Sequence, residues 1–279
     1  MALPLKPMAM LALVREFQSI SAEQATLAVT GSGSGELAAA LRRELGRGEG
    51  ADPAAVVASW QGATALLRVQ AGPLDAAGEE ELRAANAAKV PIVAVVVEGG
   101  PEAAPGEQRL PYVLATDHVR IGAGQGFPLD EIATALGRRV GERSSGLAAR
   151  LPVLRPGICD ALVKNASKRN AMVGSVIPVP GADLPVLALT QLRLVLRIAH
   201  AHGEPVDTTR LPELLGVVAG AIGLRGVARA LAGSIGPGWL VKGAVAYGGT
   251  RAIGEAAIRY FERRDAAAGS GPGAGSGAA

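Results

Sequence analysis

Apolar and polar positions alternate in short blocks along residues 24–145, and the blocks differ in period. Runs of aliphatic and β-branched residues bounded by Gly or Pro predict strands, and the clearest is PIVAVVVEG at 91–99. Segments with apolar residues every three or four positions predict helices between them. The predicted strands are 24–30, 55–60, 63–70, 91–99 and 110–116, and the predicted helices are 36–45, 76–89 and 129–142. This alternation predicts an α/β domain in which a parallel sheet carries helices on both faces.

The pattern becomes helical from about residue 147. A loop with three prolines at 177–185 interrupts it, and Gly203 is suited to cap a helix end. Helices are predicted at 155–175, 186–203, 213–233 and 239–264. The predicted domains are an amphipathic N-terminal helix at 1–23, an α/β domain at 24–146, an all-α Gly-rich domain at 147–264 and a disordered tail at 265–279.

Composition narrows the class of protein. Of the 279 residues, 49% are hydrophobic and 19% are charged, which excludes a chain that is disordered throughout. The single cysteine, Cys159, excludes an internal disulfide and a cysteine-cluster metal site. Residues 1–149 carry 13 Lys or Arg against 17 Asp or Glu, whereas residues 150–279 carry 15 against 8. A basic, apolar second half suits an anionic membrane surface or an acidic partner, although the preference for Arg over Lys also fits compositional bias.

The N-terminal residues do not resemble a secretory signal. The apolar run from Met8 to Val14 is short, and Arg15 and Glu16 follow at once where a signal peptide has a small-residue cleavage site. No segment offers the roughly 18 to 20 uncharged apolar residues of a simple spanning helix. We therefore expect a cytoplasmic protein, and peripheral or integral attachment at the inner face of the cell membrane stays open.

The turn between the first predicted strand and helix reads TGSGSGEL from Thr30. Nucleotide-binding α/β proteins carry their phosphate loop at this turn, because backbone N–H groups at a helix N-terminus bind anions. The candidate nucleotide-binding residues are Gly31, Ser32, Gly33, Ser34 and Gly35. However, Glu36 stands where a Walker loop has its lysine, and no Ser or Thr follows to hold magnesium. Either an ordinary strand–turn–helix connection or nucleotide binding without hydrolysis fits this turn.

Other candidate chemistry is sparse. The guanine-specific N-K-x-D pattern is absent after the 91–99 strand, and the pair Thr116–Asp117 is too short to identify a site. His200 and His202 lie two residues apart at a helix end, where solvated or capping roles fit them better than metal binding. Cys159 is expected to be a buried thiol. We therefore predict no catalytic residue, no metal and no cofactor, and expect that the chain is not an enzyme.

The last two predicted helices are rich in glycine. Gly216 and Gly220 form a G-x-x-x-G pattern, which lets helix backbones approach closely in membranes and in dense soluble bundles. Because each helical glycine costs roughly 1 kcal/mol, close packing or lipid must offset it. A membrane-apposed hairpin and a tightly packed helical core therefore both stay open. The candidate membrane or partner contacts are Gly216, Gly220, Arg225, Arg229, Trp239 and Lys242.

The second half also resembles a known family. The PGADLP loop, the QLR helix and the ending YGGTRAIGEAA…YFE, within residues 150–262, resemble the bacterial family called domain of unknown function 697. Members of that family often accompany or are fused to Era-like GTPase domains, and related proteins are described as membrane-associated. The resemblance implies that the α/β domain is a GTPase-like, P-loop-like domain whose motifs have degenerated. It supplies no catalytic residues.

These observations predict a pseudoenzyme: a non-catalytic GTPase-like scaffold with a helical domain that associates with a membrane or a partner. The expected partners are an anionic membrane surface, a protein such as a GTPase, or a second copy of the chain, and nucleic acid is not expected. The alternative is an atypical nucleotide-binding switch that holds a phosphate through the backbone amides of Gly31–Gly35 alone.

Overall fold

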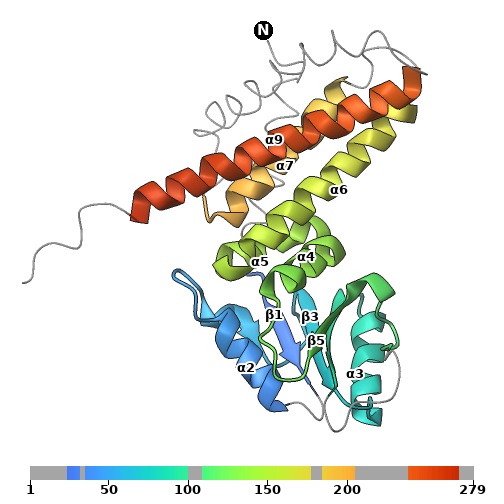
Figure 1. Ribbon diagram of the computed structural model, residues 1–279, viewed down its shortest axis with the longest axis vertical. Coiled ribbons are helices and arrows are strands. Elements are labelled where there is room, and N and C mark those ends of the chain that lie inside the picture. Colours follow the sequence, from blue (N-terminus) through green and yellow to red (C-terminus); the bar gives the residue numbers. More distant parts are fainter. Residues whose placement is uncertain (1–23, 32–34, 100–108, 177–183, 205–237, 270–279) are drawn as a thin grey trace, which may run out of the picture. The chain divides into compact units, whose positions relative to one another are not determined.

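A computed structural model describes residues 24–31, 35–99, 109–176, 184–204 and 238–269 (Figure 1). The chain divides into two compact units, and the division falls after Asn165, within helix α6 (Arg155–Val176). We call the described residues up to 165 the α/β unit and those from 166 to 269 the helical unit. The predicted N-terminal helix at 1–23 and the predicted helix at 213–233 lie outside the described residues.

The α/β unit is built on one five-stranded parallel sheet with the strand order β2-β1-β3-β4-β5. Its strands are β1 (Leu27–Thr30), β2 (Val56–Val57), β3 (Ala65–Ala71), β4 (Ile92–Glu98) and β5 (His118–Gly122). The central strands are buried on both faces, as the continuous apolar runs predict for a parallel sheet. The predicted α/β architecture is therefore confirmed.

Helices cover both faces of this sheet (Figure 1). The α/β unit contains α2 (Gly35–Leu45), α3 (Ala76–Ala87), α4 (Leu129–Val140), α5 (Ser144–Arg150) and the start of α6, with 3₁₀ turns at Pro53–Ala55, Ala115–Asp117, Gly141–Arg143 and Pro152–Leu154. Because β2 and β4 lie to opposite sides of the β1–β3 pair, right-handed crossovers place α2 and α3 on opposite faces. The residues under α3 form one core cluster with Leu82 and Ala85, which includes Ala28, Leu66 and Ala94.

The fifth strand differs from the prediction. The segment 110–116 was expected to be a strand, but β5 is His118–Gly122, and 110–116 forms turns. Tyr112 has a φ of 65°, which no strand residue adopts. The imidazole of His118 accepts a hydrogen bond from the backbone N–H of Leu110 at 3.1 Å, and its Nδ1 lies 2.9 Å from the carbonyl oxygen of Leu114. These bonds fold the predicted strand back onto the start of β5.

The second strand is shorter than predicted. Within the expected segment 55–60, only Val56–Val57 pair with β1, and a 3₁₀ turn capped by Asp52 precedes them. Arg150 of α5 donates to Asp52 at 2.6 Å and to the carbonyl oxygen of Ala25 at 2.6 Å. The same arginine therefore joins the end of α5 to the turn before β2 and to the segment that leads into β1.

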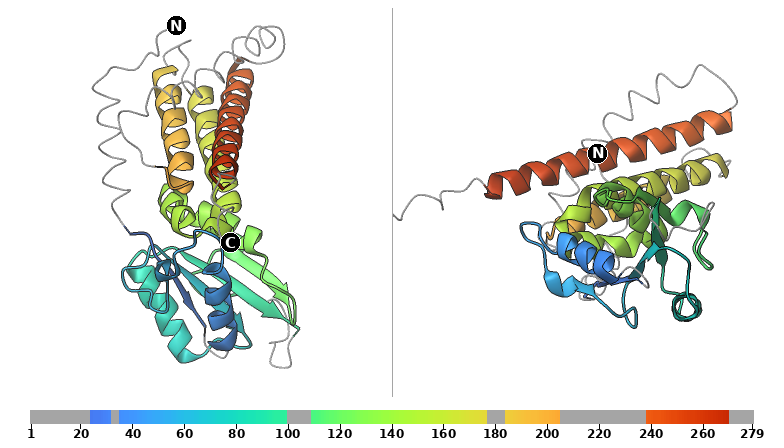
Figure 2. Two further views of the ribbon diagram at one scale, coloured as in Figure 1. Left: turned by 90° about the vertical axis from the view of Figure 1, so that its left-hand side faces the viewer. Right: turned by 60° about the horizontal axis from the view of Figure 1, so that its bottom comes forward.

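The helical unit comprises the second half of α6 with α7 (Leu184–Ala201) and α9 (Gly238–Gly269), which pack side by side (Figure 2). The predicted helices at 155–175, 186–203 and 239–264 are confirmed. Gly203 has a φ of 76° and caps α7 as predicted. The helix α9 continues to Gly269, so its last turn enters the segment from residue 265 that was predicted to be disordered.

Candidate functional site

The predicted phosphate loop lies at the point where the strand order of the sheet reverses. β1 ends at Thr30 and α2 begins at Gly35, so the turn leaves the carboxyl end of a strand and enters a helix N-terminus. Its neighbours β2 and β3 lie on opposite sides of β1, which is the topological position where open α/β sheets bind ligands. Gly31 and Gly35 are described, whereas Ser32, Gly33 and Ser34 lie outside the described residues.

A charged cluster lies beside this turn, on the face of the sheet that α3 covers. Thr30 and Arg68 are register partners on adjacent strands, so their side chains point to the same face. Arg68 is 2% exposed and forms an ion pair with Glu81 of α3. The hydroxyl of Thr30 donates to the same carboxylate at 3.1 Å. The buried guanidinium nearest the turn is thus already neutralised by a glutamate.

Gly78 explains how such a long side chain fits beneath a helix. A Cβ built at Gly78 would collide with the Nη2 atom of Arg68 and would lie 2.8 Å from Oδ1 of Asp75. Asp75 caps α3 by accepting from the Gly78 N–H at 2.8 Å. The absence of a side chain at residue 78 therefore allows Arg68 to be buried against the first turn of α3.

Two further carboxylates lie near the carboxyl edge of the sheet. Arg120 of β5 pairs with Glu98 at the end of β4, and Glu36 is exposed in the first turn of α2. Negative charge near the amino end of a helix is favourable for the helix, but it repels an anionic ligand at the same place. The carboxylates of Glu36 and Glu98 therefore work against the binding of a triphosphate at the described part of this edge.

The residues that the sequence singled out further along the chain have structural roles. Asp117 of the Thr116–Asp117 pair is 1% exposed and pairs with Arg138 at 3.1 Å and with Arg139 at 3.6 Å, which fixes α4 against the sheet. Cys159 is buried, as predicted. The side chains of the described ranges contain no group of His, Cys, Asp and Glu that could hold a metal ion.

Of the two histidines at the end of α7, His202 differs from the expectation of a solvated or capping residue. The side chain of His202 is 2% exposed, stacks on Phe261 of α9 and bonds Asp265 at 2.7 Å. Burial and the nearby Arg197 lower the pKa of His200. His202 was expected to be solvated or to cap the helix, but Phe261 and Asp265 of α9 cover it, whereas His200 is half-buried.

Polar residues that the sequence analysis did not single out form the interior of the helical unit. The hydroxyl of Thr250 in α9 accepts from the amide of Asn170 in α6 at 2.8 Å and from that of Gln191 in α7 at 3.2 Å. It donates in turn to the carbonyl oxygen of Ala246 at 2.8 Å. All three side chains are fully buried. Their positions on the inward faces of three predicted helices could have identified these residues in the sequence.

The candidate membrane or partner contacts lie mostly outside the described residues. Gly216, Gly220, Arg225 and Arg229 are outside them. Trp239 and Lys242 belong to the first turns of α9, and their side chains are not described. None of the described helices combines the length and the apolar character that crossing a bilayer requires. Comparison with family models, with curated proteins and with solved structures finds no match to this chain.

Proposed function

We propose that the chain is a non-catalytic, GTPase-like scaffold whose helical unit associates with an anionic membrane surface or with a partner protein. The observation that carries the non-catalytic part is the pairing of Arg68 with Glu81 and of Arg120 with Glu98 at the carboxyl edge. Hydrolysis of a triphosphate requires cations that stabilise the charge on the transferred phosphoryl group. These arginines are neutralised, and Glu36 stands at the position of the Walker lysine.

The association of the helical unit rests on its charge and on the family resemblance. Residues 166–176, 184–204 and 238–269 carry nine Lys or Arg against four Asp or Glu. An excess of basic residues attracts anionic lipid headgroups or acidic protein surfaces over about one Debye length. The likeness to the domain of unknown function 697 supports a GTPase, a membrane surface or a second copy of the chain as the partner.

The test of this proposal measures turnover and association on the same purified full-length chain. We expect no phosphate release from GTP or ATP with magnesium. We also expect sedimentation with phosphatidylglycerol vesicles at low salt, release at high salt, and no sedimentation with phosphatidylcholine vesicles. The R225Q/R229Q variant should sediment less, while the matched control R43Q/R47Q, which removes the same charge from the α/β unit, should not. If the chain releases phosphate from GTP or ATP and G33V abolishes this release, the chain is an enzyme.

A second function is favoured by the surroundings of Gly35. An added Cβ at Gly35 would meet nothing within 4 Å, and its φ lies outside the left-handed region. Neither packing nor backbone conformation of the described protein therefore requires a glycine at this position, whereas close approach of a phosphate would. The alternative function is a nucleotide switch that binds through the amides of Gly31–Gly35 without hydrolysis. Calorimetry with GTP, GDP and ATP tests this function. Binding that G33V abolishes supports a switch, and the absence of any binding heat refutes it.

A further inference from the structure

The connection between β2 and β3 lacks the helix that parallel strands ordinarily require. These two strands flank β1, and a crossover between parallel strands usually takes a dozen or more residues and forms a helix. Here residues 58–64 make the whole crossover. Trp60 of this connection packs against the core cluster beneath α3. The missing helix leaves a groove between Trp60 and α3.

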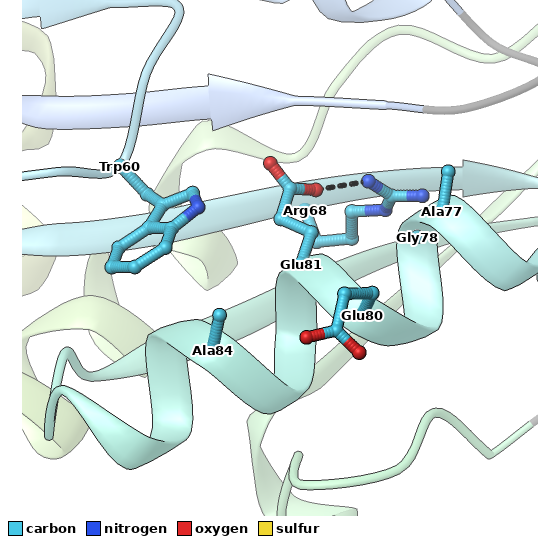
Figure 3. Close-up of a pocket in the computed structure, with 7 residues that line it drawn as sticks. All are labelled: Trp60, Arg68, Ala77, Gly78, Glu80, Glu81 and Ala84. Carbon is cyan, nitrogen blue, oxygen red and sulfur yellow. Dashed lines mark hydrogen bonds and ion pairs between the residues drawn. The ribbon is translucent and has the colours of Figure 1, made fainter.

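A pocket of about 450 Å³ occupies this groove (Figure 3). The volume falls within the range of roughly 300–1,000 Å³ that is usual for small-molecule sites. The residues that line it are Trp60, Arg68, Ala77, Gly78, Glu80, Glu81 and Ala84. Figure 3 shows the carboxylate of Glu81 between the guanidinium of Arg68 and the indole ring of Trp60. The pocket therefore combines an aromatic wall with a carboxylate that reaches its interior.

The carboxylate of Glu81 is held in one orientation. Thr30 and Arg68 both donate to its Oε2 atom. The residues that the structure describes make no hydrogen bond to its other oxygen, Oε1. Because Gly78 lets Arg68 lie beneath the helix, the ion pair on one side of the carboxylate fixes the direction of its second oxygen. Glu81 thus offers a preorganised acceptor to a ligand, which lowers the entropic cost of binding.

We propose that this pocket binds a guanidinium group. A guanidinium is planar and weakly hydrated, stacks on indole rings and donates N–H groups to carboxylates. Trp60 supplies the ring and Oε1 of Glu81 the acceptor. The positive charge of Arg68 is already paired with Oε2 of Glu81, so it does not favour an anion in the pocket. An ammonium group, which is compact and strongly hydrated, gains less from the ring. The guanidinium belongs either to a free alkylguanidine or to an arginine side chain of another protein.

This inference does not rest on the proposed function. Both use the ion pair of Arg68 with Glu81, but the scaffold proposal also depends on Glu36 in place of the Walker lysine and on the basic helical unit. The pocket depends on the groove beside α3 and on the geometry of Glu81. Either one can fail while the other holds.

The test uses the two tryptophans of the chain, Trp60 and Trp239. In the full-length W239F variant, fluorescence reports on the ring that lines the pocket. We expect butylguanidinium to change this fluorescence saturably, and butylurea, which has the same shape without the charge, to leave it unchanged. A linear response to butylguanidinium, or an equal response to both compounds, would overturn the proposal.

Variants of α3 separate the pocket from general electrostatic attraction. E81Q should weaken butylguanidinium binding at least tenfold. E80Q removes the same charge from a side chain that is 65% exposed and pairs with Arg83 at 2.9 Å, so it should change the affinity less than threefold. Because E81Q removes the partner of a buried arginine, A84L provides an independent arm that places a larger side chain in the pocket and does not alter the ion pair of Arg68 with Glu81. A84L should abolish binding, whereas A87L, at an exposed position of the same helix, should not. Equal losses in E81Q and E80Q, or unchanged binding in A84L, would contradict the assignment.

The source of the guanidinium is resolved with a second probe. The blocked tripeptide acetyl-Gly-Arg-Gly-amide presents the same group on a peptide backbone. Binding at least as tight as that of butylguanidinium identifies an arginine side chain as the ligand, and binding of butylguanidinium alone identifies a free alkylguanidine. If neither probe binds to the folded chain, the pocket is not a guanidinium site.

Discussion

The hydroxyl of Thr250 links all three described helices of the helical unit, and its removal should destabilise that unit strongly. In T250V the side chain keeps its shape, but the amides of Asn170 and Gln191 lose the acceptor to which they donate. A buried donor that loses its acceptor costs about 1–3 kcal/mol, so we expect a loss of about 2–4 kcal/mol in the free energy of unfolding. The smaller change T250S keeps the hydroxyl and should cost about 1 kcal/mol through the lost methyl group.

The measurement follows urea unfolding in a W60F background, where fluorescence comes from Trp239 of α9 alone. With a denaturant dependence of about 1–3 kcal/mol/M, the midpoint of T250V should fall about 1–2 M below that of the parent. N170L/T250V should lose less than the sum of its single changes, because replacing both partners by apolar groups removes the stranded donor. Equal midpoints for T250V and T250S, or additive losses in the double variant, would refute the reasoning.

The other predictions concern single residues of both units. G157A should destabilise the α/β unit by about 1–3 kcal/mol, because its Cβ would lie 2.7 Å from the Cβ of Ala133 and 2.7 Å from the carbonyl oxygen of Asp130. The control G126A, whose Cβ would meet nothing within 4 Å, should be neutral. Urea unfolding of both variants in the W239F background measures the difference. The hydrogen bond from Arg150 lowers the pKa of Asp52 below its unfolded value of 3.8. D52N should therefore be less stable than the parent at pH 7, and this difference should vanish as the pH falls through the folded pKa of Asp52. Burial lowers the pKa of His200, so on acidification the imidazole of the unfolded chain is protonated before that of the folded chain. The fold should therefore lose stability as the pH falls below 6.5. In H200Q, the urea midpoint should fall less between pH 7 and pH 5. In α9, G243A should destabilise the helical unit because its Cβ would collide with Oγ of Ser175, whereas G248A should stabilise it by about 1 kcal/mol.

The sequence predicted the sheet best where local pattern and tertiary environment agree. The strand β4 is apolar along most of its length because both of its faces are covered, so its run of Val and Ile identified it directly. The strand β5 lies at the edge of the sheet and alternates between half-buried and buried residues. Its letters, HVRIG, have weaker strand propensity than the neighbouring LPYVLAT. The contacts of His118 decided between the two segments, and no local pattern contains them.

The candidate site was only partly accessible from the sequence. The turn after β1 was found because strand, glycines and helix follow one another along the chain. Glu81, by contrast, is the last of three consecutive glutamates. The phase of α3, in which Gly78, Leu82 and Ala85 are buried, places residue 81 near the inward face. Its pairing with Arg68 also requires the alignment of β3 beneath α3, which is a tertiary property.

Two glycines of α9, Gly243 and Gly248, have different surroundings. The energetic cost of a glycine within a helix is offset either by close packing inside the protein or by close contact with an external surface. Gly243 meets the first condition, because α6 approaches it so closely that a Cβ would strike Ser175. Gly248 is exposed and has no neighbour within 4 Å of an added Cβ. Internal packing therefore accounts for Gly243 and not for Gly248. If G248A stabilises the helical unit yet weakens its sedimentation with anionic vesicles, the glycine serves close approach to that surface. If sedimentation is unchanged, α9 does not contact the membrane at Gly248.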